Sequence, residues 1–231
     1  MTKEFDITVL TGTSNPEKVP RTRYVVDPYL KILEKRSLLP KLVKNRYGKL
    51  IERSDVVYAA YAYTFIPVNK KLGRKVVVHL HDYKLVSPSS VILNDLVENL
   101  SICKLIIESF EIRYLEHKSI KFVLLNIGEV LRMPILAKRV AEADKVIVAS
   151  KRHAELLMKT LPKIRGKLEV VYNPPSPLSN INKEPAEVPT FLYLGGESYL
   201  KGFCNLLQAV GEFLKKYRKI KFFAGKYTSK L

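Results

Sequence analysis

The stretch VVVHLHDYKLVSP, Val76–Pro88, places two histidines and an aspartate at the end of an apolar run. Imidazole nitrogens can bind a metal ion, move a proton during catalysis or serve as polar core groups. If the run is a strand, His79 and His81 point to the same side of it, so both could reach one metal ion. Metal binding, catalysis and packing are therefore the three roles to separate.

A zinc site would need a third protein ligand, and the other histidines, His117 and His153, lie on separate helix-like segments without a matching spacing. No metal site and no cofactor are predicted. Ligands of open parallel sheets collect at the carboxyl ends of strands, where His81 and Asp82 follow the apolar run. This position favours ligand binding by His81, whereas His79, one pleat earlier, is expected to be a structural neighbour.

A second candidate site lies in FLYLGGESYLKGFCNLLQA, residues 191–209, which is typical of a strand, a glycine turn and a helix. Gly195 and Gly196 would let the backbone approach a phosphate, and the helix N-terminus would contribute amide donors. Lys201 would add a full positive charge. The spacing matches neither the Walker motif nor G-x-G-x-x-G, and an ordinary strand–turn–helix also explains it.

Short, nearly continuous apolar runs recur along the chain and predict the strands that must position these residues. Continuous runs rich in β-branched residues indicate parallel strands covered on both faces. The fold class expected is therefore α/β, with a Rossmann-like parallel sheet and flanking helices. The predicted strands are residues 5–10, 55–60, 75–80, 145–150, 168–172, 190–194 and 219–224.

Helices are predicted between these strands. Asp27-Pro28 provides an N-cap and a first-turn proline for YLKILEKR, and Ser150 provides an N-cap for KRHAELLMKTL. The segment 119–143 is mostly apolar, and Pro134 is expected to break or kink any helix there.

The longest helical zone, residues 91–118, carries an apolar stripe with helical spacing. Packing of the stripe against the sheet is the first interpretation, and a surface for a lipid or a partner is the alternative. The stripe consists of Ile92, Leu96, Leu100, Cys103, Ile107, Phe110 and Tyr114.

The proline-rich segment NPPSPLSNINKEPAEVP, residues 173–189, predicts a linker between two parts. Residues 1–172 are expected to form one β/α domain. Residues 190–231 provide only one β-α-β unit, which is much shorter than an ordinary domain. This remnant would leave sheet edges and a helix face uncovered, so self-association or docking onto the first domain is expected.

The formal net charge of +18 over 231 residues favours polyanionic partners: nucleic acid, an anionic membrane surface or phosphorylated ligands. Nucleic acid is disfavoured because there is no zinc-finger spacing, RNP-like strand or repeat. The basic segment 31–53 is a candidate for peripheral contact with anionic membrane, and a solvated helix face explains it equally well.

The sequence predicts a cytoplasmic protein, because no apolar run approaches the ~18 residues of a membrane span and MTKEFDITVL looks like a first strand. Cys103 and Cys204 are far apart and are expected to be buried, reduced thiols. A composition rich in lysine and tyrosine and free of tryptophan is also typical of thermophiles.

Three motifs in order resemble the GT-B-fold glycosyltransferases of the GT4-like group. The first is the apolar strand that ends in His81-Asp82 and is followed by a Ser-Pro pair. The second is EADKVIVASKRHAELL before a strand ending in VVYNP, and the third is FLYLGGESYLKGFCNLLQAVGEF. The resemblance runs from Phe5 to Gly225, essentially the whole chain.

The resemblance implies a retaining enzyme that needs no divalent ion, with an acceptor-side and a donor-side Rossmann-like domain. A nucleotide sugar would be the donor, and a glycan or a lipid-linked molecule the acceptor. His81 would be the catalytic histidine beside the reactive carbon of the sugar. Lys201, with Gly195 and Gly196, would contact the donor diphosphate, and Gly12 and Asp82 would lie in loops at the cleft.

The sequence departs from the family pattern in three places. Gly196 stands where the family has an arginine, and Gly12 stands alone where the family has two glycines. The carboxylate pair that holds the donor lies well downstream of residue 227, so the donor-side unit is expected to be incomplete. Two alternatives remain: a non-catalytic acceptor- or membrane-binding module, and a nucleotide-sugar epimerase of the same fold.

Overall fold

In the computed structural model, residues 5–31, 40–92, 101–174, 188–217 and 219–225 are described. The chain divides into two compact units. The first consists of residues 1–98 and 131–173, and the second of residues 99–130 and 174–231. The second unit therefore joins a helical segment from the middle of the chain to its C-terminal part, a grouping that composition alone does not indicate.

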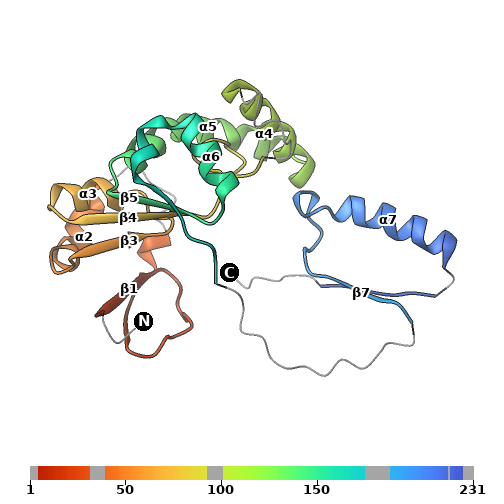
Figure 1. The fold of residues 1–231 in the computed structure, drawn as a ribbon, viewed down its shortest axis with the longest axis horizontal. Coiled ribbons are helices and arrows are strands. Elements are labelled where there is room, and N and C mark those ends of the chain that lie inside the picture. Colours follow the sequence, from red (N-terminus) through yellow and green to blue (C-terminus); the bar gives the residue numbers. More distant parts are fainter. Residues whose placement is uncertain (1–4, 32–39, 93–100, 175–187, 218, 226–231) are drawn as a thin grey trace. The chain divides into compact units, whose positions relative to one another are not determined.

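A four-stranded parallel sheet forms the centre of the first unit (Figure 1). Its strands lie in chain order: β3 (Val56–Ala59), β4 (Lys75–Leu80), β5 (Lys145–Val148) and β6 (Leu168–Val170). All four were predicted from their apolar runs, and their parallel pairing is confirmed. The α/β class with flanking helices is also confirmed, although the order contains no reversal of the kind found in doubly wound sheets.

Strand β4 is the best-covered strand of this sheet. Val76, Val78 and Leu80 are fully buried, and His79 on the other side of the strand is 8% exposed. Both faces of β4 are thus covered, as its unbroken apolar run predicts. Asp144, just before β5, fixes the start of the strand by accepting a hydrogen bond from the Val76 N–H at 2.7 Å.

Helices connect the strands of the sheet. α3 (Phe65–Lys71) joins β3 to β4, and α6 (Lys151–Thr160) with the 3₁₀ turn η2 (Pro162–Lys167) joins β5 to β6. The predicted cap of α6 is confirmed, because the Ser150 hydroxyl accepts a hydrogen bond from the His153 N–H at 3.1 Å.

A separate parallel pair is formed by β1 (Ile7–Thr11) and β2 (Thr22–Val26). Strand β2 was not predicted, because TRYVV is short and mixes polar with apolar residues. The chain then enters a helix that begins at Tyr29, whose N–H donates to the Asp27 carboxylate at 3.0 Å. Residues 32–36 of the predicted helix lie outside the described part of the chain.

A local core joins this helix start to α2 (Pro40–Glu52) and α3. Val43, Tyr47 and Ile51 form the buried face of α2, and the Tyr47 ring stacks on Phe65 at 5.5 Å between centroids. The lysines of α2 lie on its exposed face.

The second unit contains α4 (Ile102–His117), the first part of α5 (Ile120–Ala141) and a two-stranded parallel sheet. Ser109 and Asn126 are both buried, and the Asn126 amide donates a hydrogen bond to the Ser109 hydroxyl at 2.6 Å. This hydrogen bond joins α4 to α5. The other elements are β7 (Thr190–Tyr193), the 3₁₀ turn η3 (Tyr199–Lys201), α7 (Phe203–Lys216) and β8 (Lys221–Ala224).

The prediction that the 91–118 stripe packs against the sheet is wrong for the residues that are described. Ile107 and Tyr114 are 61% and 51% exposed, whereas the buried face of α4 consists of Leu105, Ser109 and Ile112. Helical spacing identified one face of the helix, but a different face is covered. Leu96 and Leu100 of the stripe lie outside the described residues.

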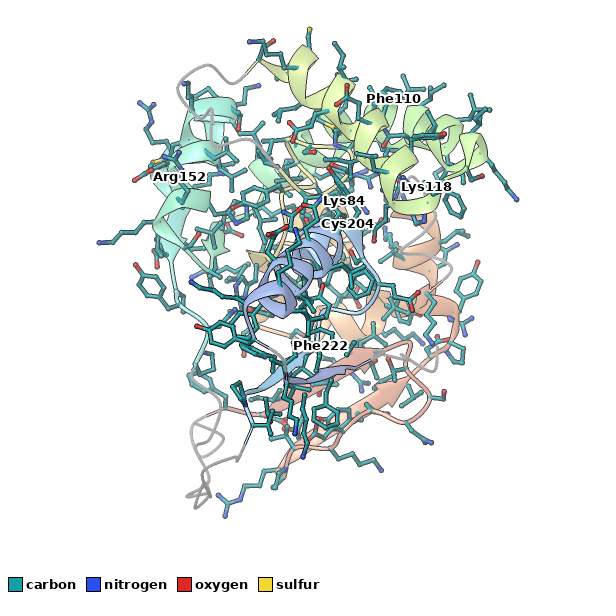
Figure 2. The ribbon with its side chains drawn as sticks, turned by 90° about the vertical axis from the view of Figure 1, so that its right-hand side faces the viewer. Lys84, Phe110, Lys118, Arg152, Cys204 and Phe222 are labelled. Carbon is teal, nitrogen blue, oxygen red and sulfur yellow. The ribbon has the colours of Figure 1, made fainter. Side chains whose placement is uncertain are left out.

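Two further predictions are corrected. Cys103 and Cys204 are exposed rather than buried, because each lies on the solvent side of its helix; Cys204 is labelled on α7 in Figure 2. Pro134 lies inside α5, which continues from Ile120 to Ala141, so it does not break the helix. The alternative, a kink at Pro134, stays a prediction. Among the described residues, no helix is both long enough and apolar enough to cross a membrane.

Candidate functional site

His81 and Asp82 leave the carboxyl end of β4, as the sequence predicts. His81 is exposed and Asp82 is half-buried. The Asp82 carboxylate accepts a hydrogen bond from the Lys84 N–H at 3.0 Å, which tightens the turn after the strand. The loop then closes on itself, because the Tyr83 N–H donates to the Ser90 carbonyl at 3.2 Å.

Two rings lie beside that of His81, one from the segment after β3 and one from β4 itself. The His81 ring lies 5.5 Å from that of Tyr61, which follows β3, and 4.0 Å from that of His79. The His79 Nδ1 in turn forms a hydrogen bond with the Tyr58 hydroxyl. His79 is therefore the structural neighbour that the sequence predicts, and His81 presents its outer side to solvent.

A third histidine reaches this end of the sheet from the next strand. His153 lies in the first turn of α6, directly after β5, and is 5% exposed. Its ring centroid lies 4.6 Å from that of Tyr83. The carboxyl ends of β3, β4 and β5 thus bring together imidazole, phenol and carboxylate groups.

Three buried polar atoms at this end of the sheet have no hydrogen-bond partner within the described part of the chain. They are the Tyr63 hydroxyl and the Nε2 atoms of His79 and His153. Buried polar atoms without partners are rare in folded proteins, because each loses its bonds to water. These atoms mark places where water or a polar ligand would bind.

Burial and the Asp82 charge set the protonation of the site. Burial lowers the pKa of His153, and the nearby Asp82 carboxylate opposes this effect. Burial, with a smaller contribution from the charge of His81, also lowers the pKa of His79. Burial and Asp82 both raise the pKa of Tyr63. At neutral pH the two buried histidines are therefore neutral and the Tyr63 hydroxyl keeps its proton, so the site offers both donors and acceptors.

Acid should destabilise the first unit through these two histidines. Their pKa is lowered in the fold from 6.5, so the unfolded chain binds protons more readily. Their contribution to stability is present above pH 6.5 and is lost as the pH falls below it. Urea unfolding of His153→Gln should show a shallower loss of stability from about pH 7 to about pH 5 than wild type. Equal slopes for the two proteins would contradict this assignment.

The second motif forms the expected strand, turn and helix in the second unit. Gly196 and Gly202 have positive φ angles of 67° and 76°, a backbone conformation that is unfavourable for residues other than glycine. Gly195 has no room for a Cβ atom, because the Tyr193 ring covers it. The exposed Lys201 ammonium makes no hydrogen bond with other described residues.

A carboxylate already occupies two donors of this turn. The Ser198 hydroxyl and the Leu200 N–H donate to the two carboxylate oxygens of Glu116, at 2.8 and 3.2 Å. The turn therefore binds an anionic group within its own unit, on α4. Glu116 was not predicted as a partner of this turn, because it lies far from Ser198 in the sequence.

Gly12, after β1, contacts the start of the following helix. A Cβ atom at this position would lie 2.8 Å from the Lys31 Cγ and 3.2 Å from the Lys31 N. The glycine thus allows the strand and the helix to approach closely, which accounts for it without a ligand. No group of three His, Cys, Asp or Glu side chains with metal-binding geometry occurs in the ranges described.

Sequence reasoning placed His81 and Asp82 but missed Tyr61, Tyr63 and His153. Tyr61 and Tyr63 follow the carboxyl end of β3, and His153 lies in the helix that follows β5. Predicting that they lie near His81 requires the order of the strands in the sheet, which the sequence does not give. The capping serine before His153 was the available signal, since it marks the end of β5.

Neither a scan against models of known protein families nor a search of curated proteins found a match to this sequence.

Proposed function

We propose that the protein is a retaining glycosyltransferase that uses a nucleotide-sugar donor. The observation that carries the proposal is the cluster at the carboxyl end of β4. There His81 and Asp82 lie near three buried polar atoms that have no hydrogen-bond partner among the described residues. Such a cluster suits a polyhydroxylated ligand, because sugar hydroxyls can both donate and accept hydrogen bonds. The resemblance to GT-B enzymes supports the same reading.

In this proposal His81 contacts the sugar near its reactive carbon. Cleavage of the sugar–phosphate bond leaves the electron pair on the departing diphosphate, whose growing charge must be stabilised. Lys201 is proposed to contact that diphosphate, with Gly195 and Gly196 allowing close approach of the backbone. The acceptor hydroxyl forms the new bond to the sugar, and its proton passes to the departing diphosphate oxygen. The acceptor is proposed to be a glycan or a lipid-linked molecule.

A non-catalytic acceptor-binding module is the second candidate. It is favoured by Glu116, whose carboxylate takes two donors of the turn that would otherwise face a phosphate. Under this alternative the first unit binds a glycan and no donor is turned over. A nucleotide-sugar epimerase is the other alternative. It would also use several titratable groups, such as those at this end of the sheet. Unlike the non-catalytic module, it requires a bound nucleotide sugar.

A panel of nucleotide sugars should distinguish these functions. Calorimetry should detect at least one donor, and product analysis should find the free nucleoside diphosphate and a transferred or hydrolysed sugar. Lys201→Ala should weaken donor binding about tenfold through loss of a charged contact, whereas Lys216→Ala, an exposed lysine on α7, should not. If no donor binds, the non-catalytic binding module becomes the preferred function. If the donor sugar is epimerised and no diphosphate is released, the protein is an epimerase.

A further inference from the structure

One face of α5 exposes a continuous row of large apolar side chains. The spacing of four, three, four and four residues places them on a single side of the helix. They are Ile120 (69% exposed), Leu124 (60%), Ile127 (48%), Leu131 (68%) and Ile135 (39%), and are called the α5 stripe below.

The side of α5 away from the stripe is packed in the C-terminal half of the helix, whereas Phe122 and Leu125 in the N-terminal half are 40% and 60% exposed. Asn126, Leu136 and Val140 are at most 2% exposed, and Asn126 donates to Ser109 of α4. At about 100° per residue, these side chains lie roughly opposite the centre of the α5 stripe. Leu136 and Val140 therefore orient the C-terminal half of α5 so that Leu131 and Ile135 point outward, and Asn126 anchors the N-terminal half to α4.

The extent of exposed apolar surface on the α5 stripe indicates that the stripe binds a partner. Single exposed leucines are common, but a contiguous apolar row on a helix usually marks an interaction surface. The row from Ile120 to Ile135 is about 22 Å long at 1.5 Å per residue. This length suits a helix that lies along a surface, and α5 is not apolar enough to cross a membrane.

The charges around the stripe indicate an anionic partner. Lys138 lies on the same side of the helix as the stripe, and Lys121 flanks it at about 80°. Lys118 lies at the turn before α5 (Figure 2). Glu129, the acidic residue of α5, lies on the far side, at about 160° from the centre of the stripe. Cations thus accompany the apolar row.

A second copy of the chain fits this surface poorly. A symmetric dimer would place the same cationic edge of each copy against the other, in a protein of net charge +18. An anionic phospholipid surface offers what a second copy lacks, because it supplies both hydrocarbon for the stripe and phosphate for the lysines.

We propose that α5 binds anionic membranes peripherally, with the α5 stripe inserted at the level of the headgroups and Lys118, Lys121 and Lys138 on lipid phosphates. It is proposed in place of segment 31–53, because α2, the described helix of that segment, buries Val43, Tyr47 and Ile51 and exposes mainly polar side chains. Residues 32–39 of the segment lie outside the described part of the chain. The inference does not depend on glycosyl transfer, since it concerns a different surface.

A tryptophan reporter gives a direct test, because the chain contains no tryptophan. Vesicles of phosphatidylcholine with phosphatidylglycerol should shift the emission of Leu124→Trp to shorter wavelength. Leu125→Trp is the matched control, since Leu125 is also 60% exposed but lies about 100° further around the helix. The control should shift less. No shift at position 124, or equal shifts at both positions, would overturn the proposal.

Vesicle sedimentation tests the energetics of the contact. Leu124→Glu with Leu131→Glu should reduce binding about 100-fold, since each leucine contributes about tenfold. Leu207→Glu, on an exposed leucine of α7, should leave binding within about twofold of wild type. Circular dichroism should show that all variants keep their helices. Equal losses for the stripe and α7 variants would contradict the proposal.

Salt separates a membrane from a second copy. Raising the salt concentration from about 0.05 to about 0.5 M should weaken binding to anionic vesicles, because it screens the lysine–phosphate contacts. The same change should strengthen dimerisation of a highly charged protein, which sedimentation velocity would detect. Salt-promoted dimers that Leu124→Glu abolishes, with no vesicle binding, would assign the stripe to self-association instead.

Discussion

Replacing His81 with alanine should lower the turnover of the nucleotide-sugar donor about 100-fold or more and leave the fold intact. A side chain that stabilises charge at the reacting centre contributes on this scale. The His81 ring is exposed and contacts the rings of Tyr61 and His79, so its removal opens no cavity in the core. If His81 acts mainly in the transition state, kcat should fall and KM should change little.

His117→Ala provides the matched control for this experiment. His117 is also exposed, lies in the second unit and stacks on Phe122, so the same change removes an imidazole away from β4. Its turnover should stay within about twofold of wild type. Turnover by His81→Ala equal to that of wild type would falsify the proposed role, even if the donor still binds.

The strands were predictable because each is a short apolar run between polar segments. β4 and β5 begin at the predicted residues 75 and 145, and their buried valines explain why. β2 was missed because its pattern is partly polar and its partner β1 lies in a small sheet of its own. Pairing between strands depends on the whole chain, which a local pattern does not record.

Helical faces were less predictable than helices. The stripe of the 91–118 zone was assigned to the core, yet Ile107 and Tyr114 face outward and Ser109 lies inside. Spacing reports which residues share a face, while burial depends on what packs there. A buried serine is stable here because its hydroxyl donates to the Ile106 carbonyl and accepts from Asn126.

The site was predicted where position along one strand was sufficient. His81 and Asp82 follow β4 directly, so the end of the apolar run located them. Tyr63 and His153 come from segments some 20 and 70 residues away, and only the strand order β3-β4-β5 brings them near. Glu116 is more distant still from the turn that it contacts.

Replacing Asp27 with alanine should destabilise the first unit by about 2–4 kcal/mol. The carboxylate caps the helix at Tyr29, which is worth about 1 kcal/mol. It also accepts a hydrogen bond from the Tyr47 hydroxyl at 2.9 Å. Tyr47 is 4% exposed, so an unpaired hydroxyl there costs about 1–3 kcal/mol. The ion pair with Arg46 adds little to this, because the guanidinium is half exposed and screened by water.

Thermal unfolding should therefore show a melting temperature about 5–10 °C lower for Asp27→Ala in a chain of this size. Asp55→Ala, at an exposed aspartate before β3, is the control and should change the melting temperature by less than about 2 °C. A similar decrease for both variants would show that Asp27 has no special place in the fold.

The effect of Asp27 should disappear in acid. Hydrogen bonds from Arg46, Tyr29 and Tyr47 lower the pKa of Asp27 from 3.8 to about 2. The unfolded chain thus takes up this proton at a higher pH than the folded chain, and the stabilisation, present above pH 3.8, is lost as the pH falls towards about 2. In urea unfolding, the difference between wild type and Asp27→Asn should shrink across this interval. A constant difference would mean that the charge of Asp27 does not stabilise the fold, and that only its hydrogen-bond geometry matters.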